Sequence, residues 1–357
     1  MLVTRHRAMR PRTGRAPPSP QAGYSIVELM IAVTIGLLIL AGLATLFANN
    51  SRARNEIDRA NQEIENGRYA MQLLTDDLHN AGYLAEFNPV VLPTPATKPD
   101  PCDTSVAGLN GALALSVQGY DNGANAPTCL SDLRAGTDIL VVRRASTCAV
   151  GDPGCDPYVS GAPYFQASDC NDSTELGSGN FTTYYALDTS VASLKLHLKD
   201  CTTTAAWHQY ETHIYFIAND DKPGDGVPTL KRAELGSGGF VIVPLVDGIE
   251  NLQIEYGIDT SVPTTGAPAV FTAAPDQLNA CAPALCMSYW RNVVAVKIDL
   301  LSRNPTTTLG YVDQKTYTLG LNADGSVNTV GPFNDGYKRH VYEAEVRLNN
   351  VSGRNTP

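Results

Sequence analysis

Residues 23–30 read Gly-Tyr-Ser-Ile-Val-Glu-Leu-Met, and the apolar run 31–48 follows them. Residues 29–48 include no charged side chain and no proline. A helix rises about 1.5 Å per residue, so this segment is long enough to cross a hydrocarbon core of roughly 30 Å. Glu28 stands at the start of this helix, and a carboxylate moved toward the bilayer centre costs about 3 kcal/mol. A charge at that position indicates a partner or a function.

The segment that precedes Tyr24 is basic and has no apolar stretch of its own. An ordinary secretory signal places its apolar region before the cleavage site. Here the order is reversed, so cleavage after Gly23 would leave the apolar helix in the mature chain. Basic residues next to a membrane helix favour the cytoplasmic side, which predicts that the rest of the chain lies outside the cytoplasm. The basic residues are Arg5, Arg7, Arg10, Arg12 and Arg15.

This order of features resembles the class III signal of type IV pilins and pseudopilins. The resemblance implies that a prepilin peptidase cuts after Gly23 and that Tyr24 becomes the methylated N-terminus. It also implies an assembly role for Glu28, whose carboxylate would pair with the amino group of Tyr24 on a neighbouring subunit in a low-dielectric helix bundle. The alternative is a plain single-pass anchor in which Glu28 lies near the membrane interface without a role.

The helix is expected to continue beyond the membrane, because no proline occurs between Tyr24 and Asn88. The expected domains are the leader 1–23, the transmembrane half of the helix 24–48, its amphipathic half 49–87, with the helix ending near Asn80, and a periplasmic head 88–357. Apolar residues at three-, four- or seven-residue steps predict one buried face. These residues are Ile57, Ala60, Ile64, Met71, Leu74, Leu78 and Ala81.

The head has the pattern of antiparallel β-structure, with short β-branched or alternating segments separated by Gly, Asn, Asp and Pro. The predicted fold class is α+β, a long N-terminal helix packed on a β-rich head. Residues 145–179 and 259–289 lack a core pattern and are expected to be inserted loops. Strands are predicted at 112–118, 138–144, 181–187, 194–198, 209–217, 240–246, 252–256, 293–301 and 341–348.

All cysteines follow the apolar segment, and their number is even. This predicts disulfides formed in an oxidising compartment, which for a prepilin is the periplasm. No Cys-x-x-Cys motif and no paired histidines favour zinc. The connectivity stays open, although Cys281 with Cys286 and Cys148 with Cys155 are close enough in the chain to be the first candidates. The full set is Cys102, Cys129, Cys148, Cys155, Cys170, Cys201, Cys281 and Cys286.

Charge and motifs argue against nucleic-acid binding and catalysis. The net charge is −10, and without the leader 21 basic side chains stand against 36 acidic ones, a net charge of −15. Such a chain has no general attraction for a polyanion, so direct nucleic-acid binding is not expected. The six histidines form no His-Glu-x-x-His motif, and the sequence has neither a Gly-x-Ser-x-Gly elbow nor a phosphate loop. We expect neither an enzyme nor a cofactor.

Residues 219–226 are a weak calcium candidate, with Asp220, Asp221 and Asp225 as oxygen ligands. Their spacing differs from that of an EF-hand, and Lys222 stands among the acids. A solvated hairpin turn is therefore the preferred interpretation.

Residues 247–257, 290–301 and 339–350, in this order, resemble the PilW-type minor pilins, relatives of the J-type minor pseudopilin of type II secretion. The resemblance implies a structural subunit that primes type IV pilus assembly, lies near the pilus tip and supports twitching motility, adhesion and DNA uptake. Implied partners are other minor pilins, the major pilin, a PilY-type tip adhesin, the prepilin peptidase and the inner membrane. The alternatives are a type II secretion minor pseudopilin and a membrane-tethered periplasmic ligand-binding protein or enzyme.

Overall fold

The computed structural model describes residues 23–355. Residues 1–22 of the expected leader, with its arginines, lie outside that range. The chain divides into two compact units, an N-terminal unit (Met1–Asn55) and a head unit (Glu56–Pro357). Helix α1 (Ile26–Asn80) belongs to both units. Its residues up to Asn55 belong to the N-terminal unit, and its residues from Glu56 onward are the first element of the head unit.

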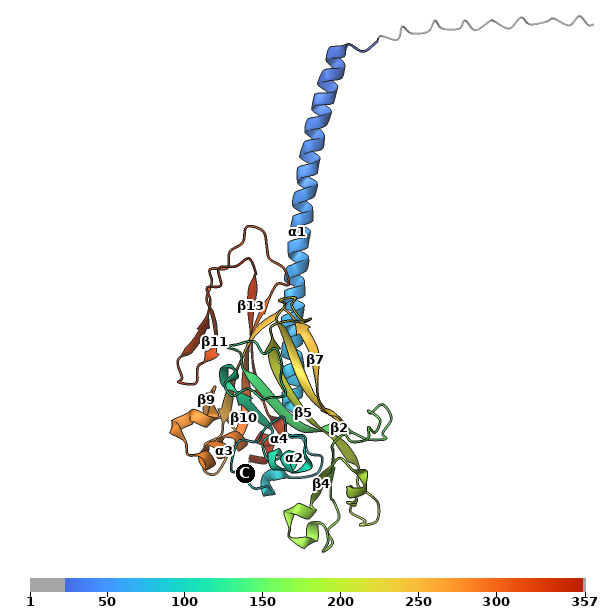
Figure 1. Cartoon of the computed structure of the whole chain (residues 1–357), viewed down its shortest axis with the longest axis vertical. Coiled ribbons are helices and arrows are strands. Elements are labelled where there is room, and N and C mark those ends of the chain that lie inside the picture. Colours follow the sequence, from blue (N-terminus) through green and yellow to red (C-terminus); the bar gives the residue numbers. More distant parts are fainter. Residues whose placement is uncertain (1–22, 356–357) are drawn as a thin grey trace, which may run out of the picture. The chain divides into compact units, whose positions relative to one another are not determined.

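The head unit is mainly β-structure, as predicted (Figure 1). After α1, its described α-helices are α2 (Val106–Ala112), α3 (Pro283–Arg291) and α4 (Asn349–Asn355). Its strands are β1 (Val117–Tyr120), β2 (Ile139–Ala149), β3 (Tyr164–Ala167), β4 (Tyr185–Asp188), β5 (Trp207–Ala218), β6 (Thr229–Gly236), β7 (Gly239–Asp247), β8 (Ile249–Ile258), β9 (Val270–Thr272), β10 (Val293–Arg303), β11 (Tyr317–Leu321), β12 (Val327–Val330) and β13 (Arg339–Arg347).

Two antiparallel sheets organise these strands. The larger sheet has the order β1-β2-β5-β3-β4, and β6 and β7 continue it from β5. The second sheet has the order β13-β10-β8-β9, and β11 and β12 form a separate hairpin. With the long helix and the disulfides, this arrangement confirms the α+β fold class.

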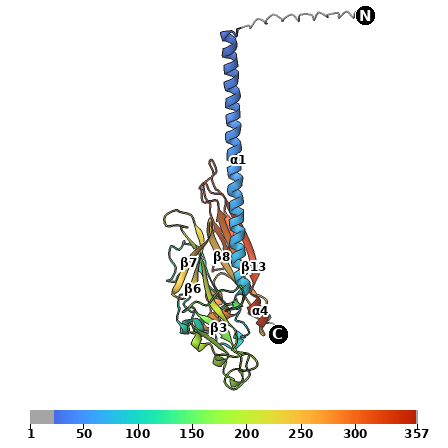
Figure 2. The ribbon, with the colours of Figure 1, turned by 90° about the vertical axis from the view of Figure 1, so that its right-hand side faces the viewer.

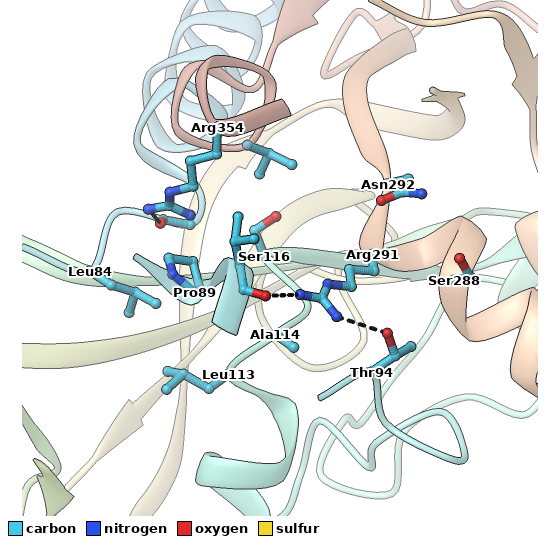
Figure 3. A pocket seen from close by; sticks show the side chains of 13 residues that line it. Leu84, Pro89, Thr94, Leu113, Ala114, Ser116, Ser288, Arg291, Asn292 and Arg354 are labelled. Atoms are coloured by element: carbon cyan, nitrogen blue, oxygen red, sulfur yellow. Dashed lines mark hydrogen bonds between the residues drawn. The ribbon is translucent and has the colours of Figure 1, made fainter. Parts of the chain in front are cut away.

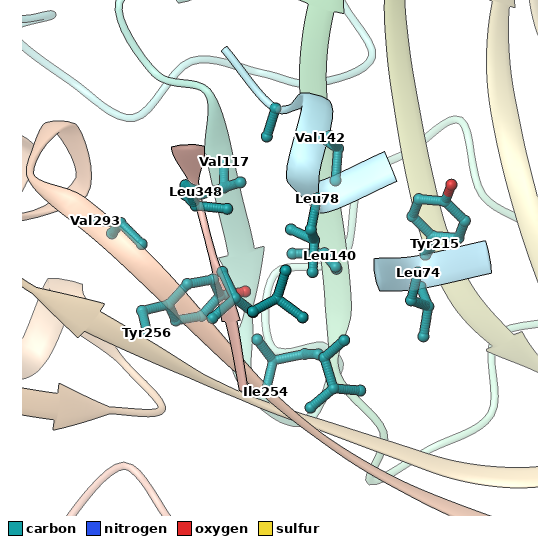
Figure 4. Packing of buried hydrophobic residues seen from close by; sticks show 14 of the residues in the cluster. Leu74, Leu78, Val117, Leu140, Val142, Tyr215, Ile254, Tyr256, Val293 and Leu348 are labelled. Atoms are coloured by element: carbon teal, nitrogen blue, oxygen red, sulfur yellow. The ribbon is translucent and has the colours of Figure 1, made fainter. Parts of the chain in front are cut away.

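The main core forms where the head part of α1 meets both sheets. Leu74 and Leu78 of α1 lie among side chains of the larger sheet, such as Val142, and of the second sheet, such as Ile254 (Figure 4). Both leucines are fully buried. Burial of such side chains typically contributes about 1.5–3 kcal/mol each, so this contact fixes the helix on the sheets.

The buried face of α1 was only partly predicted. Leu74 and Leu78 are buried as expected, but Ile57 is 59% exposed and Ile64 is 43% exposed. The buried face instead follows the steps Glu63, Gly67, Ala70, Leu74 and Asp77. The reason is the neighbouring strand β13, which runs beside the head part of α1 (Figures 1 and 2). A side chain at position 67 would overlap the ring of Tyr342 in β13, so a glycine is needed there.

Helix α1 ends at Asn80, where its end was expected, within the range 49–87. Gly82 has φ +71°, a left-handed conformation that glycine adopts without strain. Its N–H donates to the carbonyl of Arg143 in β2, at 2.9 Å. The chain therefore turns onto the larger sheet at this point.

The expected coreless insertions contain core elements, and this prediction was wrong. All four residues of β3, within 145–179, are buried, because β3 pairs with both β4 and β5. Helix α3, which overlaps 259–289, buries Met287 and Trp290. Residues 112–118 are mostly not a strand, and residues 194–198 make only the isolated bridge of His197 to Thr204. Short elements of this kind gain their burial from distant partners, which local patterns do not reveal.

The structure joins the cysteines in pairs, and both first candidates are among them. The disulfides connect Cys102 to Cys129, Cys148 to Cys155, Cys170 to Cys201 and Cys281 to Cys286. Cys148 lies on β2 and Cys286 on α3, and the other six cysteines lie in loops of the head unit.

Candidate functional site

The start of α1 is held by a reciprocal hydrogen-bond arrangement. The backbone N–H of Ser25 donates to Glu28 Oε2 at 3.1 Å, and the N–H of Val27 donates to Ser25 Oγ at 3.3 Å. This resembles a capping box, in which Ser-x-x-Glu satisfies backbone donors that have no helical partner. Glu28 therefore stabilises the first turn of its own helix, and its negative charge is favourable at the positive end of the helix dipole.

The sequence analysis predicted Glu28 at the helix start, but it did not predict that the Ser25 side chain also caps the helix. The signal was available, because the spacing Ser25-x-x-Glu28 before an apolar run is the usual sign of a capping box. Within residues 23–355, Glu28 Oε1 accepts no hydrogen bond. One carboxylate oxygen thus remains for a group outside this chain. Tyr24, the expected new N-terminus, is 92% exposed.

The apolar part of α1 is not covered by other residues in the range 23–355. The large side chains from Ile26 to Phe47 are more than half exposed, and the most apolar stretch of the helix is not buried anywhere. In the part of the chain that the structure describes, α1 is the one helix long and apolar enough to cross a membrane. Such a surface needs lipid or the helices of other subunits around it.

The three head segments that carried the family resemblance become neighbouring strands. β10 lies between β8 and β13, and Val296 of β10 is opposite Tyr256 of β8 and Val346 of β13. Segments that are far apart in the sequence are thus adjacent strands of one sheet.

A buried ion-pair cluster lies near the start of β13 and the start of β8. Arg339 in β13 pairs with Glu250 of β8 and with Asp313 at 2.9 Å, and its guanidinium lies 3.8 Å from the centre of the Phe333 ring. Burial opposes the positive charge, but the hydrogen bonds to Asp335 and Glu250 raise the pKa of Arg339 well above its usual range. The carboxylates that pair with Arg339 belong to β8 (Glu250) and to loops (Asp313 and Asp335). The cluster therefore connects strands with loops, which is a structural role.

A second buried cluster joins α1 to the larger sheet. Asp77 Oδ2 accepts hydrogen bonds from His213 Nδ1 at 2.7 Å and from the Tyr215 hydroxyl at 2.9 Å, while Arg144 Nε donates to Oδ1 at 2.7 Å. His213 lies on β5 and is almost fully buried.

Two of the three carboxylates of the calcium candidate, those of Asp220 and Asp225, bind backbone groups of their own turn. Asp220 accepts the backbone N–H groups of Gly224 and Gly226, and Asp225 accepts those of Lys222 and Val227, all at 2.7–2.9 Å. This arrangement favours the hairpin turn over a calcium site. Between residues 23 and 355, the one group with ligand atoms close enough for an ion is Cys170, Asp172 and Cys201, whose cysteines are joined in a disulfide.

Two family models match the sequence. Residues 214–350 match the model described as Type IV Pilus-assembly protein W, and this range includes the end of β5 and all of β6 to β13. Residues 18–44 match the Prokaryotic N-terminal methylation motif, which includes Gly23, Tyr24 and Glu28. Neither a comparison with curated proteins nor one with solved structures found a match.

Proposed function

We propose that this chain, a PilW-type type IV pilin, is a minor subunit that primes pilus assembly and lies at the pilus tip. The methylation motif and the apolar helix fit a single-pass inner-membrane protein whose head lies in the periplasm and later in the pilus. This family implies a structural role and contacts with other pilins and the pilus machinery.

One observation supports the assembly role above all others. Glu28 is a charged residue at the start of an apolar helix that no other part of the described chain covers. One of its oxygens caps the helix, and the other has no partner in the described residues. When the helix leaves the bilayer to pack among other helices, the Tyr24 amine of a neighbour is a group of suitable charge for this oxygen.

Cleavage after Gly23 is part of this proposal, because it creates that amine. Gly23 and Tyr24 are both exposed, which leaves the bond between them accessible to a peptidase. The finer partners we propose are other minor pilins, the major pilin and a PilY-type adhesin. We further propose that the assembled pilus serves twitching motility, attachment and DNA uptake, without direct DNA contact by this acidic chain.

The tip position is tested by immunogold labelling of the head on intact pili, together with pilus counts in a strain that lacks the chain. We expect label at pilus ends and fewer pili of normal length. Label along the whole pilus would contradict the tip position. Normal pili combined with a secretion defect would favour the type II secretion pseudopilin instead.

A further inference from the structure

A pocket of about 260 Å³ opens in the head unit beyond the end of α1 (Figure 3). Its walls come from the turn after α1, the segment 89–94, the residues 113–116 that follow α2, and the helices α3 and α4. Two arginines line it, Arg291 from the last turn of α3 and Arg354 from the last turn of α4. None of the 13 lining residues is acidic.

Both arginines are held in place by neutral acceptors. Arg291 donates to the Thr94 hydroxyl at 2.9 Å and to the Val90 carbonyl at 2.7 Å. Arg354 donates to the Gly82 carbonyl at 2.8 Å. Neither forms an ion pair with any residue between 23 and 355. A guanidinium has five N–H donors, so donors remain on both side chains.

The positive charges are partly removed from water without a compensating charge. Burial lowers the pKa of Arg291, and it lowers that of Arg354 to about 10, which leaves Arg354 protonated at neutral pH. Arg339, by contrast, is buried against three carboxylates. A partly buried cation gains most from a ligand that brings a negative charge and accepts several hydrogen bonds.

We propose that this pocket binds a carboxylate side chain presented by an acidic segment of a partner pilus protein. A carboxylate matches the planar donors of a guanidinium. The pocket is small and belongs to a strongly acidic chain, which disfavours a long polyanion such as nucleic acid or an anionic bilayer. Leu84 and Val351 provide apolar wall for the neighbouring part of the segment. That the partner belongs to the pilus rests on the proposed function, whereas binding of an acidic peptide does not.

The test uses the full-length chain in detergent and the blocked peptide acetyl-Ala-Asp-Glu-Ala-amide, with acetyl-Ala-Asn-Gln-Ala-amide as its neutral counterpart. Ser288 lines the pocket and precedes Arg291 by three residues on α3, so these two side chains are neighbours on the helix. Ser288→Asp supplies an internal carboxylate and leaves both arginines in place. Ser288→Asn is the matched neutral control.

We expect the acidic peptide to bind the wild type, and to bind Ser288→Asp at least about tenfold more weakly than the matched neutral variant Ser288→Asn. Arg291→Gln should give a similar loss, and the neutral peptide should not bind. Tryptophan fluorescence checks that each variant is folded. Equal binding by Ser288→Asp would overturn the proposal, and so would binding of inorganic phosphate without binding of the acidic peptide. Because isolated protein is used, either result is independent of whether Glu28 directs assembly.

Discussion

Asp77 on α1 and His213 on β5 are joined by a buried contact of 2.7 Å between Oδ2 and Nδ1. This contact connects the helix directly to a central strand of the larger sheet. Burial would raise the pKa of Asp77, but the hydrogen bond from His213 and the charges of His213 and Arg144 hold it well below its usual range. The carboxylate is therefore charged, and its partners fix α1 in its orientation on the sheet.

Replacement of Asp77 should destabilise the head. Asp77→Ala leaves Arg144 and His213 without their buried partner, and loss of one member of such a pair costs about 3–5 kcal/mol. We expect the free energy of unfolding to fall by about 3 kcal/mol. Urea denaturation of the full-length chain in detergent measures this, since both tryptophans, Trp207 and Trp290, belong to the head. The exposed neighbour Asp76 gives the control Asp76→Ala, and equal effects of the two variants would contradict the assigned role.

Glu63 should make the head less stable as the pH rises. Burial raises the pKa of Glu63 to about 7, against the hydrogen bond from Ser302. The folded chain thus binds this proton more tightly than the unfolded chain, in which the pKa stays near 4.5. The stability contribution is complete below pH 4.5 and is lost as the pH rises to about 7, by at most about 3 kcal/mol.

In Glu63→Gln, the free energy of unfolding should fall less steeply than in the wild type between pH 4.5 and 7.5. Denaturation curves recorded across this pH range measure it. Asp138 and Asp299 also have raised pKa values, about 7 and about 6, because both are buried. The unfolding free energy of the variant is therefore still expected to decrease somewhat with rising pH. A slope identical to that of the wild type would show that Glu63 does not take up its proton in this range.

Lys98 should hold the segment 88–103, which contains five prolines, against β1 and α3. Its ammonium lies 4.3 Å from the centre of the Tyr120 ring and 4.8 Å from that of Trp290, and it pairs with Asp276 at 2.6 Å. Lys98→Ala should lower the free energy of unfolding by about 2 kcal/mol, because desolvated cation–π contacts and an ion pair are lost together. The exposed Lys199→Ala should change it by less than about 0.5 kcal/mol. A similar small effect at position 98 would mean that the aromatic rings hold this loop without the lysine.

The disulfides should differ in their effect on stability. Removing a link that closes a longer loop frees more conformational entropy in the unfolded chain. The pair Cys170 and Cys201 closes 31 residues, whereas Cys148 and Cys155 close 7. Double replacement by serine should cost about 1 kcal/mol more for the longer loop. Thermal unfolding of both double variants compares the two losses of stability. A larger loss for the Cys148–Cys155 pair would contradict loop length as the deciding contribution.

Much of the fold could be predicted, because long regular segments have strong patterns. The strands β8 and β10 contain several β-branched residues, and α1 has a long uncharged run. The buried face of α1 was misjudged because Glu63 and Asp77 are polar. Only contacts with distant partners, such as His213, make their burial favourable.

The candidate site was predictable to a similar degree. Glu28 could be recognised locally, because a charge beside an apolar run is visible in the sequence. The pocket of Arg291 and Arg354 could not, because two separate helices bring these residues together. Arginines that lack an acidic partner cannot be identified before the fold is known.

We infer that the charge of Glu28, and not only its helix cap, directs assembly. Glu28→Gln separates the two, since a glutamine oxygen can still accept the Ser25 N–H but carries no charge. Ser25→Ala is the complementary control, because it removes the hydroxyl of the cap and keeps the carboxylate.

The most direct measurement is the amount of this subunit in sheared pili, relative to the membrane fraction, for the wild type and both variants. We predict that Glu28→Gln is inserted and cleaved normally but is incorporated at least about tenfold less, as expected for loss of a desolvated ion pair. Ser25→Ala should be incorporated almost normally. Incorporation of Glu28→Gln at the wild-type level would contradict the account.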